Sequence, residues 1–170
     1  MAPEPPWLDD QQQRVWRQWL ATGTRLDAAL GRQLQRDSGL THRDYEVLVH
    51  LTEAPEGQLR MTELADAMLW ERSRVSHQIA RMAGRGLVER MECAQDRRGV
   101  IVAVTEAGRD LLRDAAPGHV RTVRRLLFDH LTDEDLLALD RLTAAMLARL
   151  DAEAGAFPTD GAHTAYPRMS

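Results

Sequence analysis

Apolar residues follow a helical period over most of the chain and a strand period over one short stretch. We expect long helices over about 9–37, 41–54, 106–130 and 132–153, where apolar residues recur every three or four positions. Thr41, Thr105 and Thr132 stand where three of these helices begin, and a Thr side chain at such a position accepts a hydrogen bond from the first turn. Pro117 lacks a backbone N–H, which predicts a break or kink in the third helix.

The stretch from Met61 to Gly108 is organised differently, as two short helices followed by a hairpin. Thr62 is expected to cap the first short helix and Ser73 the second. The apolar residues of the second helix fall on one face, at Val75, Ile79, Met82 and Ala83. The period then changes, and we expect strands over 87–92 and 100–104, a turn over 96–99 and a short edge strand over 59–61. This order predicts a winged helix-turn-helix.

The polar side of the second short helix is basic. It carries Arg74, Ser76, His77, Gln78, Arg81 and Arg85. Seven arginines and three acidic residues lie between Arg72 and Arg98, a local charge of +4 in a chain whose net charge is −4. Such an asymmetry indicates a surface that meets a polyanion, although a solvated helix face with a charged hairpin tip would give the same count.

These residues resemble the MarR family of bacterial transcriptional regulators. The resemblance lies in Ser73-Arg-Val-Ser-His-Gln-Ile-Ala-Arg-Met82, Arg85-Gly-Leu-Val-Glu-Arg90, Asp96-Arg-Arg98 and Val104-Thr-Glu-Ala-Gly108. It implies a mainly α (α+β) fold with about six helices and a small antiparallel β-wing. It also implies a homodimeric repressor that a small-molecule ligand releases from pseudo-palindromic operator DNA.

The two ends of the chain carry more apolar helix face than the central unit is expected to cover. We therefore expect residues 9–37 and 106–153 to form a dimerisation region, with 41–105 as the DNA-binding unit between them. Together they make one domain over 9–153, which 170 residues comfortably allow. The Pro-rich residues 1–8 and the aperiodic residues 154–170 are expected to be a flexible N-terminus and a disordered tail.

The candidate DNA contacts are grouped by the part of the DNA that each is expected to meet: the major groove, the phosphates or the minor groove. The expected major-groove residues are Ser73, Arg74, Ser76, His77 and Arg81, because the start of a recognition helix reaches base edges. Arg72 and Arg85 are expected to contact phosphate, and Arg97 and Arg98 the minor groove from the wing. Two residues keep a second interpretation. Ser73 serves equally well as a helix cap, and Asp96 either orients a neighbouring arginine, as the resemblance implies, or forms the turn.

The resemblance implies a ligand pocket between the dimerisation helices and the winged unit. Its candidate residues are Trp16, Trp19, His50, Met68, Trp70, His119 and Arg124, although ordinary core packing explains such residues more often. The histidines lack metal-ligand spacing, so no metal site is expected, and no cofactor either. Cys93 is the only cysteine and is interpreted as a small apolar residue rather than a redox sensor.

Other classes of function fit the sequence less well. No nucleophile elbow or phosphate-binding glycine loop is present, so an enzyme is not expected. The alternatives are a winged-helix module for protein–protein interaction and an architectural DNA binder without a ligand. The single cysteine and the lack of an N-terminal secretory signal predict a cytoplasmic protein, and no apolar run is long enough for a membrane span.

Overall fold

The computed structural model describes residues 7–93 and 96–156, with side chains described except at 92–98 and 154–156. Its helices are α1 (Asp10–Ser38), α2 (His42–Glu53), α3 (Met61–Ala67), α4 (Arg72–Gly84), α5 (Glu106–Val123) and α6 (Asp133–Ala156). A short 3-10 turn, η1 (Pro55–Gly57), follows α2, and a π-helical turn, η2 (Arg124–Phe128), follows α5. The strands are β1 (Gln58–Arg60), β2 (Val88–Cys93) and β3 (Asp96–Val104). This is the predicted mainly α winged helix-turn-helix.

The three strands form one antiparallel sheet in the order β1-β3-β2. Leu59 pairs with Val102 and Val88 with Val104, so the edge strand expected near residue 59 is confirmed. The turn expected over 96–99 is wrong, because these residues already belong to β3. The apolar residues that alternate along β3 supply Val102 and Val104 to the core, and this attaches the wing to the helices.

The buried core lies under the helix-turn-helix. It joins the end of α1 to α2, α3, α4 and the sheet, with Leu34, Leu40, Leu48, Leu51, Leu64, Val75, Ile79 and Met82 fully buried. Gly108, at the start of α5, closes this unit. A Cβ atom there would lie 2.2 Å from the Leu87 carbonyl oxygen, so only glycine lets α5 approach the strand so closely.

Local capping chemistry explains where the helices begin. Thr41 and Asp44 form a capping box at α2, Thr105 accepts a hydrogen bond from the Gly108 N–H, and Thr132 accepts one from the Asp135 N–H. The predicted caps at Thr41, Thr105 and Thr132 are therefore confirmed.

Two other predicted caps are wrong. Helix α3 begins at Met61 and α4 at Arg72, so Thr62 and Ser73 lie inside their helices. The Arg60 N–H instead donates to the Glu63 carboxylate at 2.8 Å.

Helix α5 continues through Pro117 without a break, contrary to the expectation from sequence. Proline removes one N–H donor, and the hydrogen bonds on either side of it maintain the helix. The α-helical hydrogen-bond pattern ends only later, at the π-helical turn η2, before α6 begins.

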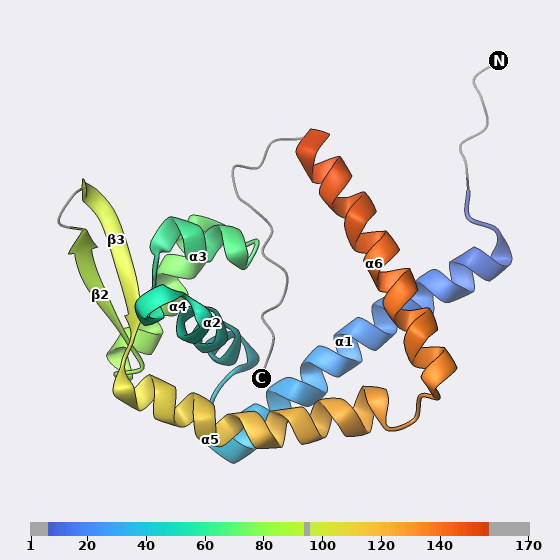
Figure 1. The fold of residues 1–170 in the computed structure, drawn as a ribbon, viewed down its shortest axis with the longest axis horizontal. Helices are drawn as coiled ribbons and strands as arrows, with labels where there is room; N and C mark the ends of the chain where they lie inside the picture. The colour runs from blue at the N-terminus through green and yellow to red at the C-terminus, as the bar shows by residue number, and fades with distance from the viewer. Residues whose placement is uncertain (1–6, 94–95, 157–170) are drawn as a thin grey trace.

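The helices at the two ends of the chain extend away from the winged unit (Figure 1). Helix α1 packs along α5, and α6 crosses the N-terminal half of α1, where Met146 shares a hollow with Trp16 and Trp19. Large apolar side chains on both helices remain about half exposed or more: Val15, Trp16, Trp19, Leu20, Leu136, Leu137, Leu142, Met146, Leu147 and Leu150. No described helix combines the length and apolar character that crossing a membrane would require.

The turn between α3 and α4 contains a strained leucine. Leu69 has φ +52° and its side chain is 72% exposed. Its N–H donates to the Asp66 carbonyl, and the next N–H, from Trp70, donates to the Ala65 carbonyl. This is the Schellman arrangement, whose left-handed position favours glycine.

We expect Leu69→Gly to raise the free energy of unfolding by about 0.5–1 kcal/mol, because it removes left-handed strain and little packing. Urea denaturation followed by circular dichroism measures this. Leu69→Ala is the matched control, since it shortens the same side chain and keeps the strain. Equal stabilisation by both substitutions would contradict the explanation.

Candidate functional site

Helix α4 divides into a buried and an exposed face, as the apolar spacing predicted. Val75, Ile79 and Met82 are fully buried. The opposite face brings most of the predicted DNA contacts together, with Arg72, Ser73, Arg74, His77 and Arg81 exposed and Ser76 half-buried. Within α4 the first turn carries no acidic residue, and the N-cap residue Glu71 makes no side-chain capping hydrogen bond.

Gln78 departs from this division. It was assigned to the polar outer face, but the structure buries it to 2% exposure, where its Nε2 donates to Asp44 Oδ1 at 2.6 Å. Its Oε1 accepts a hydrogen bond from the exposed Arg81 guanidinium. Gln78 therefore joins the core to the outer face of α4.

The Asp44 carboxylate holds α4 against α2. Its Oδ1 binds Gln78, and its Oδ2 accepts hydrogen bonds from the Arg85 guanidinium at 2.8 Å and from the Thr41 N–H at 2.9 Å. Asp44 is only 3% exposed, so these bonds replace the hydration that a buried carboxylate gives up. The carboxylate thus helps to orient the recognition helix, together with the packing of its buried apolar face.

Arg85 has a role that the sequence did not reveal. Besides Asp44, its guanidinium donates to the Gly39 carbonyl oxygen at 3.0 Å, at the junction of α1 and α2. The phosphate contact stays a prediction, since the Arg85 side chain is 41% exposed, but two of its guanidinium nitrogens also bond inside the protein. The signal that could have indicated this is the Asp44 capping position, which places a carboxylate at the start of α2.

Arg74 lies against the turn that precedes α4. Its guanidinium carbon is 4.4 Å from the centroid of the Trp70 ring, and that of Arg43, from α2, is 5.4 Å from the same centroid. Trp70 is half-buried and packs on the core. Trp70 therefore contacts Arg74 on the exposed face of α4. It was a candidate ligand residue, but it does not line the cavity between α2 and the α5–η2 junction.

The wing residues Asp96, Arg97 and Arg98 lie in β3, but their side chains fall outside the described residues, as does that of Cys93. Their roles therefore stay predictions. The backbone pairing of Cys93 with Asp96 brings the two strands together at this end of the hairpin.

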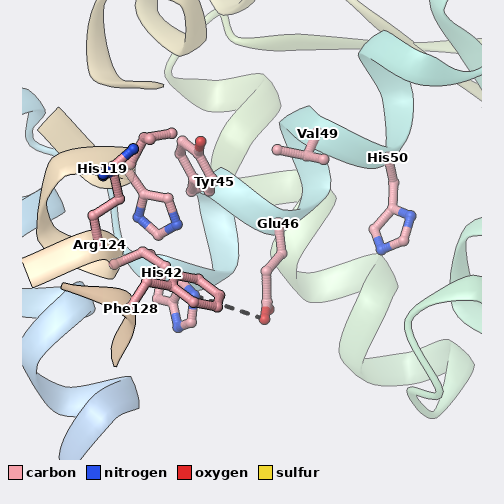
Figure 2. Close-up of a pocket in the computed structure, with 10 residues that line it drawn as sticks. His42, Tyr45, Glu46, Val49, His50, His119, Arg124 and Phe128 are labelled. Carbon is pink, nitrogen blue, oxygen red and sulfur yellow. Dashed lines mark ion pairs between the residues drawn. The ribbon is translucent and has the colours of Figure 1, made fainter. Parts of the chain in front are cut away.

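A cavity of about 280 Å³ lies between α2 and the junction of α5 with η2 (Figure 2). Three predicted ligand residues line it: His50, His119 and Arg124. The other lining residues were not predicted, and they are His42, Tyr45, Glu46, Val49, Val120, Val123 and Phe128. Most of them face the cavity at intervals of three or four along α2 and α5, a spacing that periodicity alone assigns to core packing.

The remaining predicted ligand residues do not reach this cavity. Trp16 and Trp19 line a separate hollow on the N-terminal half of α1, together with Met146. Met68 packs against the hydrophobic core, as Trp70 does. Helical spacing identifies apolar side chains without indicating which neighbour each one meets, and that these residues bind a ligand stays a prediction.

Histidines dominate the polar part of the cavity. His42 Nδ1 lies 2.6 Å from Asp27 Oδ1 of α1, and its Nε2 lies 4.0 Å from Glu46 Oε1, the pair marked in Figure 2. The centroid of the His119 ring lies 4.3 Å from the centroid of the Tyr45 ring and 6.1 Å from that of the His42 ring. Tyr45 Oη and His119 Nδ1 are buried without a hydrogen-bond partner, so both can form one with a bound molecule.

Burial lowers the pKa of two histidines of the cavity. It lowers the pKa of His119 below its ordinary value, and the nearby His42 lowers it further. Burial also lowers the pKa of His50, with Glu46 acting weakly in the opposite direction. Among the described residues no group of three or more His, Cys, Asp and Glu side chains is placed to hold a metal ion.

Comparison with known proteins identifies relatives that cover most of the chain. The profile of the MarR family matches residues 38–99. The crystal structure of AbsC, a MarR family transcriptional regulator from Streptomyces coelicolor, is 41% identical, with a TM-score of 0.80 over 86% of this chain and 99% of that one. A second MarR family regulator from Streptomyces coelicolor, solved in complex with DNA, is 42% identical, with a TM-score of 0.80 over 94% and 96%.

A more distant structure shares the fold. It is the structure of BpsR from Bordetella bronchiseptica, described with regulation of its DNA binding by 6-hydroxynicotinic acid. BpsR is 24% identical to this chain, with a TM-score of 0.69 over 83% of this chain and 96% of that one. Comparison with curated protein sequences found no match.

The histidines of the cavity predict a pH dependence of stability. When the folded-state pKa is below the ordinary value of 6.5, the unfolded chain binds the proton first, so stability falls as pH drops through about 6.5. We expect the free energy of unfolding to decrease between about pH 7.5 and about pH 5.5, and His119→Gln to make this decrease smaller. Urea titrations at several pH values measure it. The exposed His77→Gln is the control, and an unchanged slope in His119→Gln would contradict the assignment.

Proposed function

The chain belongs to the MarR family of transcriptional regulators, and from this premise we propose a homodimeric repressor that a small molecule releases from a pseudo-palindromic operator. The observation that carries the proposal is the outer face of α4. It presents three exposed arginines and a histidine, while Asp44 fixes the helix from the inner side.

We assign base reading to the N-terminal half of α4. Arg74 and His77 lie one turn apart on its exposed side, with Ser73, Ser76 and Arg81 beside them. Arginine pairs with guanine through two hydrogen bonds, which gives such residues specificity in the major groove. Arg72 is assigned to phosphate, and Arg97 and Arg98 to the minor groove, with Asp96 orienting its neighbours. The relative solved in complex with DNA supports DNA binding by this chain.

The dimer follows from the apolar surface of the terminal helices. Leu137, Leu147 and Leu150 of α6 are 60% exposed or more, and the tryptophans of α1 are half exposed. Burying apolar surface is favourable, so the same helices of a second copy provide the simplest cover. Residues 9–37 and 106–153 then form the dimerisation region around the DNA-binding unit 41–105. A two-fold axis would place the recognition helices about 34 Å apart, one turn of DNA.

The cavity is the proposed effector site. It lies between α2 of the DNA-binding unit and the α5–η2 junction of the dimerisation region, so an occupant contacts both. Its apolar lining and its unpartnered Tyr45 and His119 atoms suit a small, mostly apolar molecule with a hydrogen-bonding group. Support for ligand control comes from BpsR, a protein of this fold described with regulation by 6-hydroxynicotinic acid. Linkage requires that a ligand weakening DNA binding is itself bound more weakly in the presence of DNA.

The other functions are less well supported. A protein-interaction module does not need exposed arginines on α4, and an architectural DNA binder does not need the cavity. The related proteins are regulators rather than enzymes. A regulator of this kind acts in the cytoplasm, where the chromosome is.

Recognition-helix and wing residues should fail in different ways. Arg74→Ala should cost ~1–3 kcal/mol of operator binding and relax preference at particular base pairs. Arg98→Ala should weaken operator and random DNA alike and lower the slope of log affinity against log salt by ~1 for each phosphate that is no longer neutralised. Fluorescence anisotropy with an operator obtained by selection from random duplexes measures both.

The control is Arg141→Ala on α6, which should change neither quantity. Uniform weakening by Arg74→Ala, without a relaxed base pair, would remove the base-reading assignment. Equal binding of operator and random DNA by the unmodified protein would favour the architectural alternative.

The dimer should depend on the apolar side chains of α6. Light scattering after size exclusion should give twice the chain mass at micromolar concentration. Leu147→Glu should weaken the dimer by about 3 kcal/mol or more, roughly 100-fold, because each copy would no longer bury a leucine side chain. Arg149→Glu makes a larger charge change on the same helix and should leave the dimer intact. A monomeric unmodified protein would contradict the proposal.

A further inference from the structure

The turn before α4 contains an aromatic ring that two arginines share. Trp70 contacts Arg74 of the recognition helix at 4.4 Å and Arg43 of α2 at 5.4 Å, measured from each guanidinium carbon to the ring centroid. Both distances lie within the range of a favourable cation–π contact. The Trp70 ring is held by packing against the core, and the turn that carries it is held by the backbone N–H of Trp70, which donates to the Ala65 carbonyl at 2.9 Å.

A fixed ring has a direct consequence for Arg74. An exposed arginine at the start of a helix otherwise samples many rotamers, and each must be given up when the guanidinium meets a base. A guanidinium already lying over a ring gives up fewer, because its plane is held before DNA arrives. Trp70 thus pre-organises a side chain assigned to base reading.

Arg43 connects this ring to the cavity. Its guanidinium pairs with Glu46 Oε2 at 3.0 Å, while the other Glu46 oxygen lies 4.0 Å from His42 Nε2. Glu46 lines the cavity, and its side chain is 18% exposed (Figure 2). A continuous series of contacts therefore leads from the cavity through Glu46, Arg43 and Trp70 to Arg74.

The charges along this series give it a direction. Arg43 and Arg74 carry like charges over one ring and repel each other, and the Glu46 carboxylate offsets the charge of Arg43. A molecule in the cavity that binds Glu46 or draws it toward His42 leaves the charge of Arg43 less compensated. The repulsion on Arg74 then increases, and its interaction with Trp70 weakens.

We infer that Arg43 and Trp70 are positioning residues for Arg74, and that Glu46 makes this arrangement sensitive to what occupies the cavity. The inference rests on the proposed function, because it takes Arg74 as a base-reading residue and the cavity as the effector site. It adds the specific residues through which the cavity acts on Arg74.

A double-mutant cycle tests the positioning role. The readout is the ratio of operator to random-DNA affinity, which removes the uniform effect of a changed charge. Trp70→Leu should lower this ratio roughly two- to fivefold per half-site, and Trp70→Phe should largely restore it, because phenylalanine keeps an aromatic face. In Arg74→Ala protein, Trp70→Leu should have no further effect, whereas its effect should remain in His77→Ala protein. Additive effects of the Trp70 and Arg74 substitutions would overturn the positioning role.

Fluorine NMR of protein labelled with 5-fluorotryptophan, recorded without DNA, and the operator-to-random affinity ratio together test the link to the cavity. The Trp70 signal is assigned by its disappearance in Trp70→Phe. Glu46→Gln should shift this signal and lower the operator-to-random ratio, and the second effect should disappear in Trp70→Leu protein. Glu53→Gln, the same change at the other end of α2, should do neither. An unmoved Trp70 signal in Glu46→Gln would overturn the link.

Different results would contradict the proposed function and this inference. Unmodified protein that does not prefer operator over random DNA removes the proposed function, and the fluorine signal still decides whether Glu46 controls the environment of Trp70. A clear operator preference combined with additive effects removes only this inference.

Discussion

The geometry of the DNA-binding unit depends on the buried carboxylate of Asp44. It takes part in the cap that begins α2, and it orients α4 by binding Gln78 in the middle of that helix and Arg85 just beyond its end. A buried carboxylate without these partners would be strongly unfavourable, so each of the three contacts favours keeping α2 and α4 in this arrangement. The exposed face of α4 is consequently set by hydrogen bonds on its hidden face.

Helix α2 is the element that the two proposed sites share. Its inner side contributes Asp44, Leu48 and Leu51 to the buried interior beneath the recognition helix, while His42 and Glu46 face the cavity. A rigid helix transmits a displacement from one side to the other without needing a flexible hinge. This arrangement gives a physical route by which a small molecule could affect DNA reading, either by moving α2 or through the side chains that Glu46 contacts.

The terminal helices have a different balance of forces. The winged unit has a closed core, whereas α1 and α6 keep large apolar side chains in contact with solvent. Such surface is unusual for an isolated protein and is the physical basis of the proposed dimer. In that dimer the recognition helices would be held at a separation set by α1, α5 and α6, so the affinity for an operator would depend on parts of the chain that never contact DNA.

Local sequence was sufficient to predict most of the elements, because helix and strand periods and capping residues act over a few positions. The winged helix-turn-helix, the caps at Thr41, Thr105 and Thr132, and the exposed basic face of α4 were predicted in this way. The positions of Gln78 and Arg85 were not, since their bonds to Asp44 join residues 34 and 41 positions apart. Nor did periodicity separate His119, which lines the cavity, from Trp16, which lies elsewhere, because both occupy apolar helix faces. A period shows that a side chain is on the inner face of its helix, and the packing of the folded chain determines what that side chain meets there.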